Sequence, residues 1–150
     1  MNIKKTTVIE DGVKYTVKKF DTTKQWYLNR QRHRVNGPAI EHDDGTKEWW
    51  LNDKRHRTDG PAFEFYDGHK EWFLNGKRHR TDGPAVEHID GTKEWILNDK
   101  LHREDGPAIE RDGGCKGWFL NGIEYTKPNY YKELFHRGLI TEEQCFLELV

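Results

Sequence analysis

The stretch WWLNDKRHRTDGPAFEFYDGHKE, which runs from Trp49 to Glu71, decides the fold because it recurs along the chain. A shift of 23 residues in either direction brings most of its letters onto themselves. The landmarks that keep this spacing are a tryptophan (Trp26, Trp49, Trp72, Trp95, Trp118), an asparagine (Asn29, Asn52, Asn75, Asn98, Asn121) and a Gly-Pro-Ala triplet (from Gly37, Gly60, Gly83, Gly106). A fixed period between about 20 and 50 residues is typical of repeat architectures. We therefore expect a chain of like units.

Each repeat predicts two strands and two turns. Residues 47–51 and 61–65 are rich in aromatic and apolar side chains with a period of two, which is typical of strands. Between them, residues 52–60 form a basic loop that opens with Asn-Asp, and residues 66–68 contain the Asp-Gly of a tight turn. The predicted fold class is mainly β: a single-layer or curled antiparallel β-meander of 23-residue hairpin repeats with a short helical C-terminal cap.

The two ends of the chain depart from the repeat and predict caps. Residues 1–25 have the pattern of a degenerate first repeat, with a strand, an Asp-Gly turn and a second strand. The hairpin repeats extend over residues 26–125. Residues 126–150 predict two short helices, the second opened by a capping box at residues 141–144. We expect these helices to cover the open edge of the last strand.

Composition limits both the core and the function. Apolar residues make up 33% of the chain and charged residues 34%, but an aromatic content of 13% argues against disorder. We therefore expect a folded chain with little deep interior. The formal net charge of −1 gives no overall attraction to nucleic acid or to an anionic membrane. The sequence contains no serine, which excludes a serine nucleophile.

Cysteine usage and hydropathy indicate a compartment. Cys115 and Cys145 are too few for a disulfide framework and suit a reducing environment. No apolar run has the length of a signal peptide or the ~18 residues of a membrane span. These features predict a cytoplasmic protein.

The repeat resembles a known family. The order Asp-Gly-Thr-Lys-Glu-Trp-X-Leu-Asn-Gly-Lys-Arg-His-Arg, best matched over residues 45–57 and 68–80, is similar to that of MORN repeats, and the resemblance covers roughly residues 10–125. The chain departs from the family in the Arg-Thr-Asp-Gly-Pro-Ala that follows the histidine, where the ordinary repeat has Gly-X-Gly. This variant resembles repeats of bacteriophage and large-virus proteins. The resemblance implies a non-catalytic binding module, and suggests a phage accessory protein that blocks a host component in the host cytoplasm.

Residues that recur in every repeat meet the same neighbour each time, so we interpret them as structural. Tryptophan and leucine of one strand share a face, as do their counterparts in the other repeats. The arginine of each His-Arg pair and the glutamate after Gly-Pro-Ala-X predict a ladder of ion pairs. A row of metal ligands is the alternative, but like residues would lie about 9.5 Å apart, too far to share one ion. We expect no metal site and no cofactor.

Positions that differ between repeats are the candidates for binding. Two variable positions, one on each strand, are apolar and share the face opposite to the recurring tryptophan and leucine, so both faces are apolar. They are Tyr27, Trp50, Phe73, Ile96 and Phe119 on the first strand, and Ile40, Phe63, Val86 and Ile109 on the second. Either the ribbon curls to cover both faces, or one face carries an exposed aromatic stripe that binds a partner. A protein partner is the principal prediction. The predicted partner-binding residues are Tyr27, Trp50, Phe63, Phe65, Tyr66, His69 and Phe73.

The basic loops provide an alternative site for nucleic acid, a nucleotide or another anionic ligand. Their side chains are expected to align along one edge of the meander: Arg30, Arg32, Lys54, Arg55, Lys77, Arg78 and Lys100. Such a ridge could follow a phosphate backbone. Acidic residues such as Asp53 and Asp59 in the same loops dilute its field, so a solvated edge that discourages sheet pairing is the competing interpretation. Catalysis is not expected, since no compact constellation of catalytic residues appears and Cys115 has no base nearby in sequence.

Overall fold

The computed structural model describes residues 3–149, and within them the chain is mainly β, with 19 strands in antiparallel hairpins and two helices. It divides between His79 and Arg80 into two compact units. The first unit contains β1 (Lys4–Glu10), β2 (Val13–Lys19), β3 (Thr23–Leu28), β4 (Gln31–Arg32), β5 (Ile40–His42), β6 (Lys47–Glu48), β7 (Trp50–Leu51), β8 (Lys54–Arg55), β9 (Phe63–Glu64), β10 (Lys70–Glu71), β11 (Phe73–Leu74) and β12 (Lys77–Arg78).

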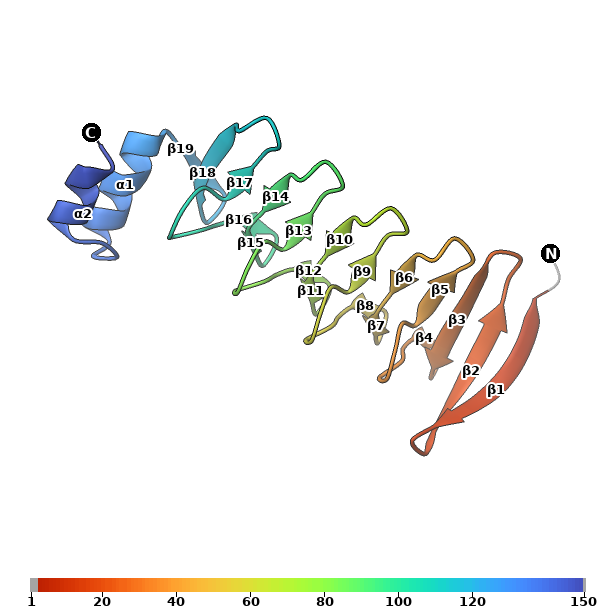
Figure 1. Cartoon of the computed structure of the whole chain (residues 1–150). Coiled ribbons are helices and arrows are strands. Elements are labelled where there is room, and N and C mark those ends of the chain that lie inside the picture. The colour runs from red at the N-terminus through yellow and green to blue at the C-terminus, as the bar shows by residue number, and fades with distance from the viewer. Residues whose placement is uncertain (1–2, 150) are drawn as a thin grey trace. The chain divides into compact units, whose positions relative to one another are not determined.

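The second unit contains β13 (Val86–Glu87), β14 (Lys93–Glu94), β15 (Ile96–Leu97), β16 (Lys100–Leu101), β17 (Ile109–Glu110), β18 (Lys116–Leu120), β19 (Ile123–Tyr125), α1 (Lys127–His136) and α2 (Glu142–Leu147). In each unit, consecutive hairpins form one antiparallel main sheet (Figure 1). Its strand order is β1-β2-β3-β5-β6-β9-β10 in the first unit and β13-β14-β17-β18-β19 in the second. The predicted fold class is confirmed.

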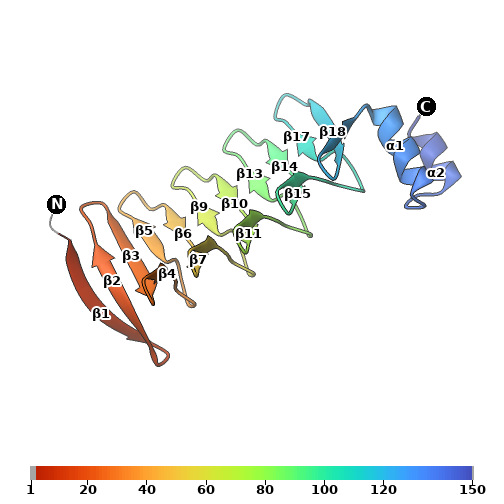
Figure 2. The same cartoon turned by 180° about the vertical axis from the view of Figure 1, so that it is seen from behind.

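The repeats at Trp49, Trp72 and Trp95 each contain a second, smaller hairpin that the sequence pattern did not predict. The strand expected over residues 47–51 breaks at Trp49, whose N–H donates to the carbonyl of Ala62 (2.8 Å) and whose carbonyl accepts from the N–H of His56 (3.1 Å). The chain leaves the main sheet at this residue, and β7 and β8 form a separate side hairpin (Figure 2). The expected loop over residues 52–60 is therefore a turn, the strand β8 and a shorter loop.

The side hairpins turn as the Asn-Asp and Asn-Gly pairs predict. Asn52 and Asp53 have φ values of 51° and 59°, and Asn75 and Gly76 have 52° and 84°. A two-residue turn with both residues in the left-handed region matches the twist of a hairpin, and asparagine, aspartate and glycine tolerate that region best. This explains why the asparagine recurs every 23 residues.

The recurring arginine forms the predicted ladder with glutamate. Arg57 Nη1 donates to Glu64 Oε1 (2.9 Å) and to the carbonyl of Pro61 (3.1 Å), and its Nε donates to Asp59 Oδ1 (2.9 Å). Its guanidinium lies 4.0 Å from the ring centroid of Trp49. The same arginine–glutamate pair occurs as Arg34–Glu41, Arg80–Glu87 and Arg103–Glu110. The ladder is confirmed, and it gives the tryptophans an arginine as ring partner.

This arginine also explains the Gly-Pro-Ala triplet. A Cβ added at Gly60 would lie 2.9 Å from the Cζ of Arg57, so any larger residue would displace the guanidinium. Ala62 is fully buried, its N–H donating to Glu71 and its carbonyl accepting from Trp49. The glycine of the triplet thus leaves room for the guanidinium of the arginine, and the small alanine allows neighbouring strands to approach closely.

Within each unit the side hairpin folds over the main sheet, so both variable apolar positions are largely covered. Phe73 and Ile96 of the side hairpins are buried, and so are Ile40 and Val86 of the main sheet. The guanidinium of Arg55, on a side hairpin, lies 4.8 Å from the ring centroid of Phe63 on the main sheet. The curled alternative therefore describes each unit better than a flat ribbon.

Both ends carry small apolar clusters. Tyr15, Val17 and Trp26 form one cluster in the first unit, and Leu120, Tyr130 and Leu134 form another in the second. The predicted capping box is present at Thr141, whose hydroxyl accepts from the N–H of Gln144 (3.2 Å).

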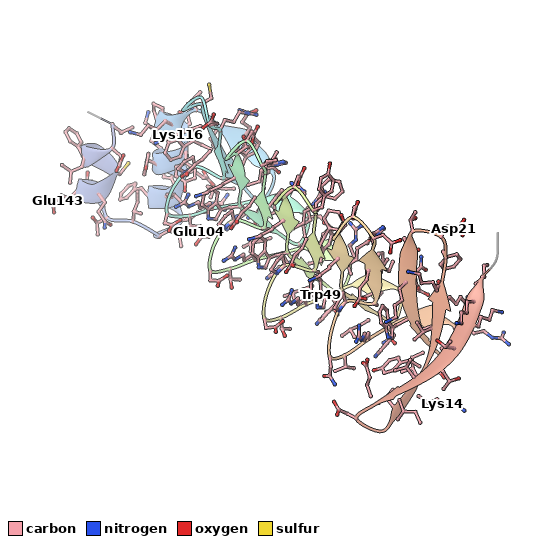
Figure 3. All side chains as sticks on the ribbon, turned by 45° about the vertical axis from the view of Figure 1, so that its right-hand side comes forward. Lys14, Asp21, Trp49, Glu104, Lys116 and Glu143 are labelled. Atoms are coloured by element: carbon pink, nitrogen blue, oxygen red, sulfur yellow. The ribbon has the colours of Figure 1, made fainter. Side chains whose placement is uncertain are left out.

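Each repeat has two opposite ends. Figure 3 shows them in the second unit, where the loop with Glu104 lies at one end and the turn before Lys116 lies at the other. We call these the loop side and the turn side.

Candidate functional site

The β9–β10 hairpin differs from neighbouring hairpins at the residue that follows its first strand. In the β5–β6 hairpin, His42 Nε2 lies 3.1 Å from Glu48 Oε1. In the β13–β14 hairpin, His88 Nε2 lies 3.0 Å from Glu94 Oε1. Phe65 occupies the same repeat position in β9–β10, where it cannot make such a pair.

The histidine–glutamate pair is nevertheless kept, because a histidine has moved across the hairpin. His69 stands where the neighbouring hairpins have Thr46 and Thr92, and its Nε2 lies 3.0 Å from Glu71 Oε1. The frame of the repeat is thus satisfied without a histidine at position 65. Phe65 is an irregular residue whose presence the scaffold does not require.

The charge of Glu71 on the β9–β10 hairpin is balanced by its hydrogen-bonding partners. Burial of the Glu71 carboxylate works to raise its pKa, but hydrogen bonds from Arg78 Nε (2.7 Å) and from His69 outweigh burial and lower the pKa of Glu71. Glu71 is therefore ionised and paired at neutral pH. The β9–β10 hairpin therefore keeps a paired glutamate although it carries aromatic residues that the neighbouring hairpins lack.

The structure brings six of the predicted residues into one aromatic cluster: Trp50, Phe63, Phe65, Tyr66, His69 and Phe73. Ring centroids lie 5.9 Å apart for Phe63 and Phe65, 4.7 Å for Phe65 and Tyr66, and 6.2 Å for Phe63 and His69. Arg55 joins the remaining rings, with its guanidinium 5.3 Å from Trp50 and 5.4 Å from Phe73.

The members of the aromatic cluster differ in exposure. Tyr66 is 63% exposed and Phe65 36%, on the turn side of the repeat. Trp50, Phe63 and His69 are half-buried, and Phe73 is only 8% exposed. A partner could touch Phe65 and Tyr66 directly, whereas Phe73 supports the cluster from beneath.

The seventh predicted residue, Tyr27, lies outside the cluster. Its hydroxyl donates to Gln25 Oε1 (2.6 Å), and the Nζ of Lys18 lies 4.2 Å from its ring centroid. Burial raises the pKa of Tyr27. Its strand partner Arg32 lies 3.8 Å from the ring centroid of Trp50, so that arginine links Tyr27 to the cluster.

The predicted basic edge is divided by the strand geometry. Arg32, Arg55 and Arg78 carry ion pairs with Asp53, Glu48 and Glu71, respectively. The other four residues are exposed: Lys54, Lys77 and Lys100 on the side hairpins, and Arg30 in the turn between β3 and β4. Successive residues of a strand point to opposite faces, so the seven side chains do not form one ridge.

Sequence reasoning missed two cavities on the loop side, which we call the loop-side grooves. One, of about 580 Å³, lies in the first unit between the loop from Arg34 to Gly37 and the loop that follows His56. The other, of about 570 Å³, lies at the equivalent place of the second unit, between the loop from Arg80 to Gly83 and the loop that follows His102. Each has a tryptophan and a leucine at its wall. Because these residues recur, the repeat pattern classified them as structural and gave no signal of a cavity.

The remaining chemistry is sparse in the part of the chain that the structure describes. Residues 3–149 contain no group of three histidine, cysteine, aspartate or glutamate side chains placed to hold a metal ion. No helix among them has the length and hydropathy needed to cross a membrane. Searches of protein-family models and of curated proteins found no match to the chain. The resemblance to MORN repeats therefore rests on the residues quoted above.

Proposed function

We propose that the chain is a non-catalytic binding protein, built from MORN-like repeats, that takes a protein partner at the aromatic cluster. The observation that carries the proposal is the exchange in the β9–β10 hairpin. His69 takes over the pair with Glu71, and Phe65 and Tyr66 are exposed in a turn where the scaffold needs neither ring.

The composition of the cluster suits a protein partner. Tryptophan, tyrosine and arginine are enriched among residues that dominate binding energies at protein interfaces. Here Trp50, Arg55 and Tyr66 belong to one contact network, with half-buried rings holding the exposed ones in place. Rings fixed by neighbours lose little side-chain entropy on binding. The resemblance to viral repeats adds the proposal that the partner is a host component that the protein blocks.

The sharpest test rewrites this turn with the residues of a neighbouring repeat. The double variant Phe65→His/Tyr66→Asp gives the β9–β10 turn the letters of His42-Asp43, so it should fold as the other hairpins do. We expect affinity capture from a host lysate to retain a protein on the native chain and to lose it on the double variant. Retention should survive high salt, because apolar contacts are weakly screened.

A matched control separates the cluster from surface aromatics in general. Ile89→Ala removes an exposed apolar side chain (68% exposed) at the turn position equivalent to Tyr66 and should leave capture unchanged. Equal retention by the native chain and the double variant, or no retention at any salt concentration, would count against the proposal.

The anionic-ligand alternative has its own signature. Binding through Lys54 and Lys77 should weaken steeply as salt rises. Lys54→Glu/Lys77→Glu should abolish such binding and leave the aromatic cluster intact. The ion pairs of Arg32, Arg55 and Arg78 favour the protein partner, because these three side chains are already neutralised.

A further inference from the structure

The loop-side groove has a repeated design. In the second unit, Arg80 and Gly83 contribute one wall, and Trp95, Leu97 and His102 of the following repeat contribute the others. The groove of the first unit has the same residue types 46 residues earlier: Arg34, Gly37, Trp49, Leu51 and His56. A volume of about 570 Å³ lies in the range of ligand-binding cavities.

In the last repeat the corresponding space is filled by the chain itself. The side chain of Tyr130, from α1, is fully buried, and its ring centroid lies 5.0 Å from that of Trp118. The hydroxyl of Tyr130 donates to the carbonyl of Arg103 (2.7 Å) and accepts from the N–H of Gly106 (3.3 Å). The phenol thus packs beside the tryptophan and hydrogen-bonds to backbone groups of Arg103 and Gly106 in the loop.

In the first repeat, a tyrosine ring from β2 packs at the equivalent place. Tyr15 of β2 is 2% exposed and packs with Trp26, the counterpart of Trp49 and Trp95. Its ring centroid lies 6.5 Å from that of His33. A tyrosine therefore occupies the groove at each end, although one comes from a strand and the other from a helix.

In the last repeat, burial of the loop glycine and proline and of the leucine follows this difference in occupancy, whereas Trp118 is half-buried like Trp95. Gly106 and Pro107 are buried beside Tyr130, whereas Gly83 and Pro84 of the preceding loop are only half-buried. Leu120 is fully buried in the filled groove, and Leu97 is half-buried in the open one. The two inner grooves are therefore open. They expose the surface that corresponds to the one that Tyr15 and Tyr130 cover in the end repeats.

The backbone of an occupant could not follow α1 into an inner groove. Thr126 stands 23 residues after Arg103, so α1 begins where the next repeat would place its loop. In the inner repeats that place is taken by the loop itself, such as the one after His102. Only a side chain can enter between the two loops.

We infer that the inner loop-side grooves bind tyrosine side chains presented by a protein partner. The ring would lie against Trp95 or Trp49, and the hydroxyl would meet the backbone of Arg80 and Gly83, or of Arg34 and Gly37. This surface lies on the loop side and shares no residue with the aromatic cluster, so it does not depend on the proposed function.

The test uses N-acetyl-tyrosinamide as the probe and the full chain labelled for NMR. Titration should shift the indole N–H signals of Trp49 and Trp95 and the amide signals of Gly37 and Gly83. N-acetyl-phenylalaninamide lacks the hydroxyl and should bind about five- to tenfold more weakly, since the hydrogen bonds of the hydroxyl to the loop backbone are lost.

Two variants make each groove the control for the other. Leu97→Trp fills the groove of the second unit and should remove the shifts at Trp95 while those at Trp49 remain. Leu51→Trp should do the reverse. A variant that fails to fold would lose the signals of both, and the second variant then decides.

Three outcomes would overturn the inference. Equal shifts with both probes would show that the hydroxyl is not recognised. Shifts confined to Trp118, or none up to the solubility limit of the probe, would show that the inner grooves do not accept a phenol. Shifts that appear on raising the protein concentration without a probe would assign the grooves to a second copy of this chain.

Discussion

The end repeats and the inner repeats share the same recurring residues, but their loop-side grooves differ in whether a side chain fills them. Trp26 and Leu120 are buried in grooves that Tyr15 and Tyr130 occupy, whereas Leu97 is half-buried at the wall of an open cavity. The difference shows that the repeat does not by itself complete its loop side. At the ends of the chain, residues outside the repeat complete it.

The largest expected effect comes from emptying the filled groove. Tyr130→Ala removes a fully buried ring and its hydrogen bonds, and should lower the free energy of unfolding by about 3–5 kcal/mol. Tyr66→Ala makes the same chemical change at a residue that is 63% exposed, and should change it by less than about 1 kcal/mol. Urea denaturation of both variants measures the difference. Similar costs would show that the end groove is no better packed than the surface.

A second pair of variants compares one repeat position in the two settings. Leu120→Ala should cost about 2–4 kcal/mol, because the side chain is fully buried against Tyr130 and Leu134. Leu97→Ala should cost about 1 kcal/mol, because Leu97 is half-buried at the wall of an open groove. Denaturant midpoints at matched slopes give the comparison. If Leu97→Ala proved as costly as Leu120→Ala, the inner groove would be closed in solution.

Alkaline pH should loosen the filled end selectively. Burial raises the pKa of Tyr130 to about 12, whereas an unfolded tyrosine titrates near about 10. The folded chain therefore holds this proton more tightly, and stability falls as pH rises from about 10 to 12, by at most about 2–3 kcal/mol. Denaturation of the native chain and of Tyr130→Phe across this range isolates the effect, since the variant lacks the titrating group. Parallel curves would contradict it.

The smallest expected effect concerns the ion pair between Glu10 and Arg34 at the first repeat. Asn36 replaces the aspartate that pairs with arginine in later loops, and Glu10 supplies the carboxylate instead, accepting from Arg34 Nη2 (2.7 Å) and Nε (3.0 Å). Hydrogen bonding to Arg34 lowers the pKa of Glu10. Glu10→Gln should therefore cost about 1 kcal/mol above pH ~4.5, and less as pH falls through the lowered pKa.

Thermal unfolding at several pH values checks the Glu10 prediction. Glu124→Gln is the control, because Glu124 is an exposed glutamate on β19. A cost at Glu10 that does not shrink in acid would mean that the carboxylate charge plays no part.

Local rules recovered most of the fold from sequence. Left-handed asparagine turns, the arginine–glutamate ladder and the capping box at Thr141 each depend on residues close together within a repeat or a helix. The break at Trp49 could not be seen, because the alternation of apolar residues continues through it. It is fixed by hydrogen bonds to Ala62 and His56, which lie directly before β9 and directly after β8.

The residues of the aromatic cluster could be named from the sequence, whereas the loop-side grooves could not. Irregularity between repeats drew attention to Phe65, Tyr66 and His69, and the structure places these side chains close together. It could not show that His69 compensates for Phe65, since that requires knowing that both sides of the hairpin reach Glu71. The grooves were missed because Tyr15 and Tyr130 lie outside the repeat, where periodicity carries no information.

The movement of the histidine across the β9–β10 hairpin has a consequence for engineering. The carboxylate of Glu71 is held by His69, while Glu48 is held by His42 from the other side of its hairpin. A designer can therefore choose which arm of a hairpin carries the histidine and give the vacated position to any side chain that a new target demands. Each repeat then offers a graft point that can be changed without redesigning the frame beneath it.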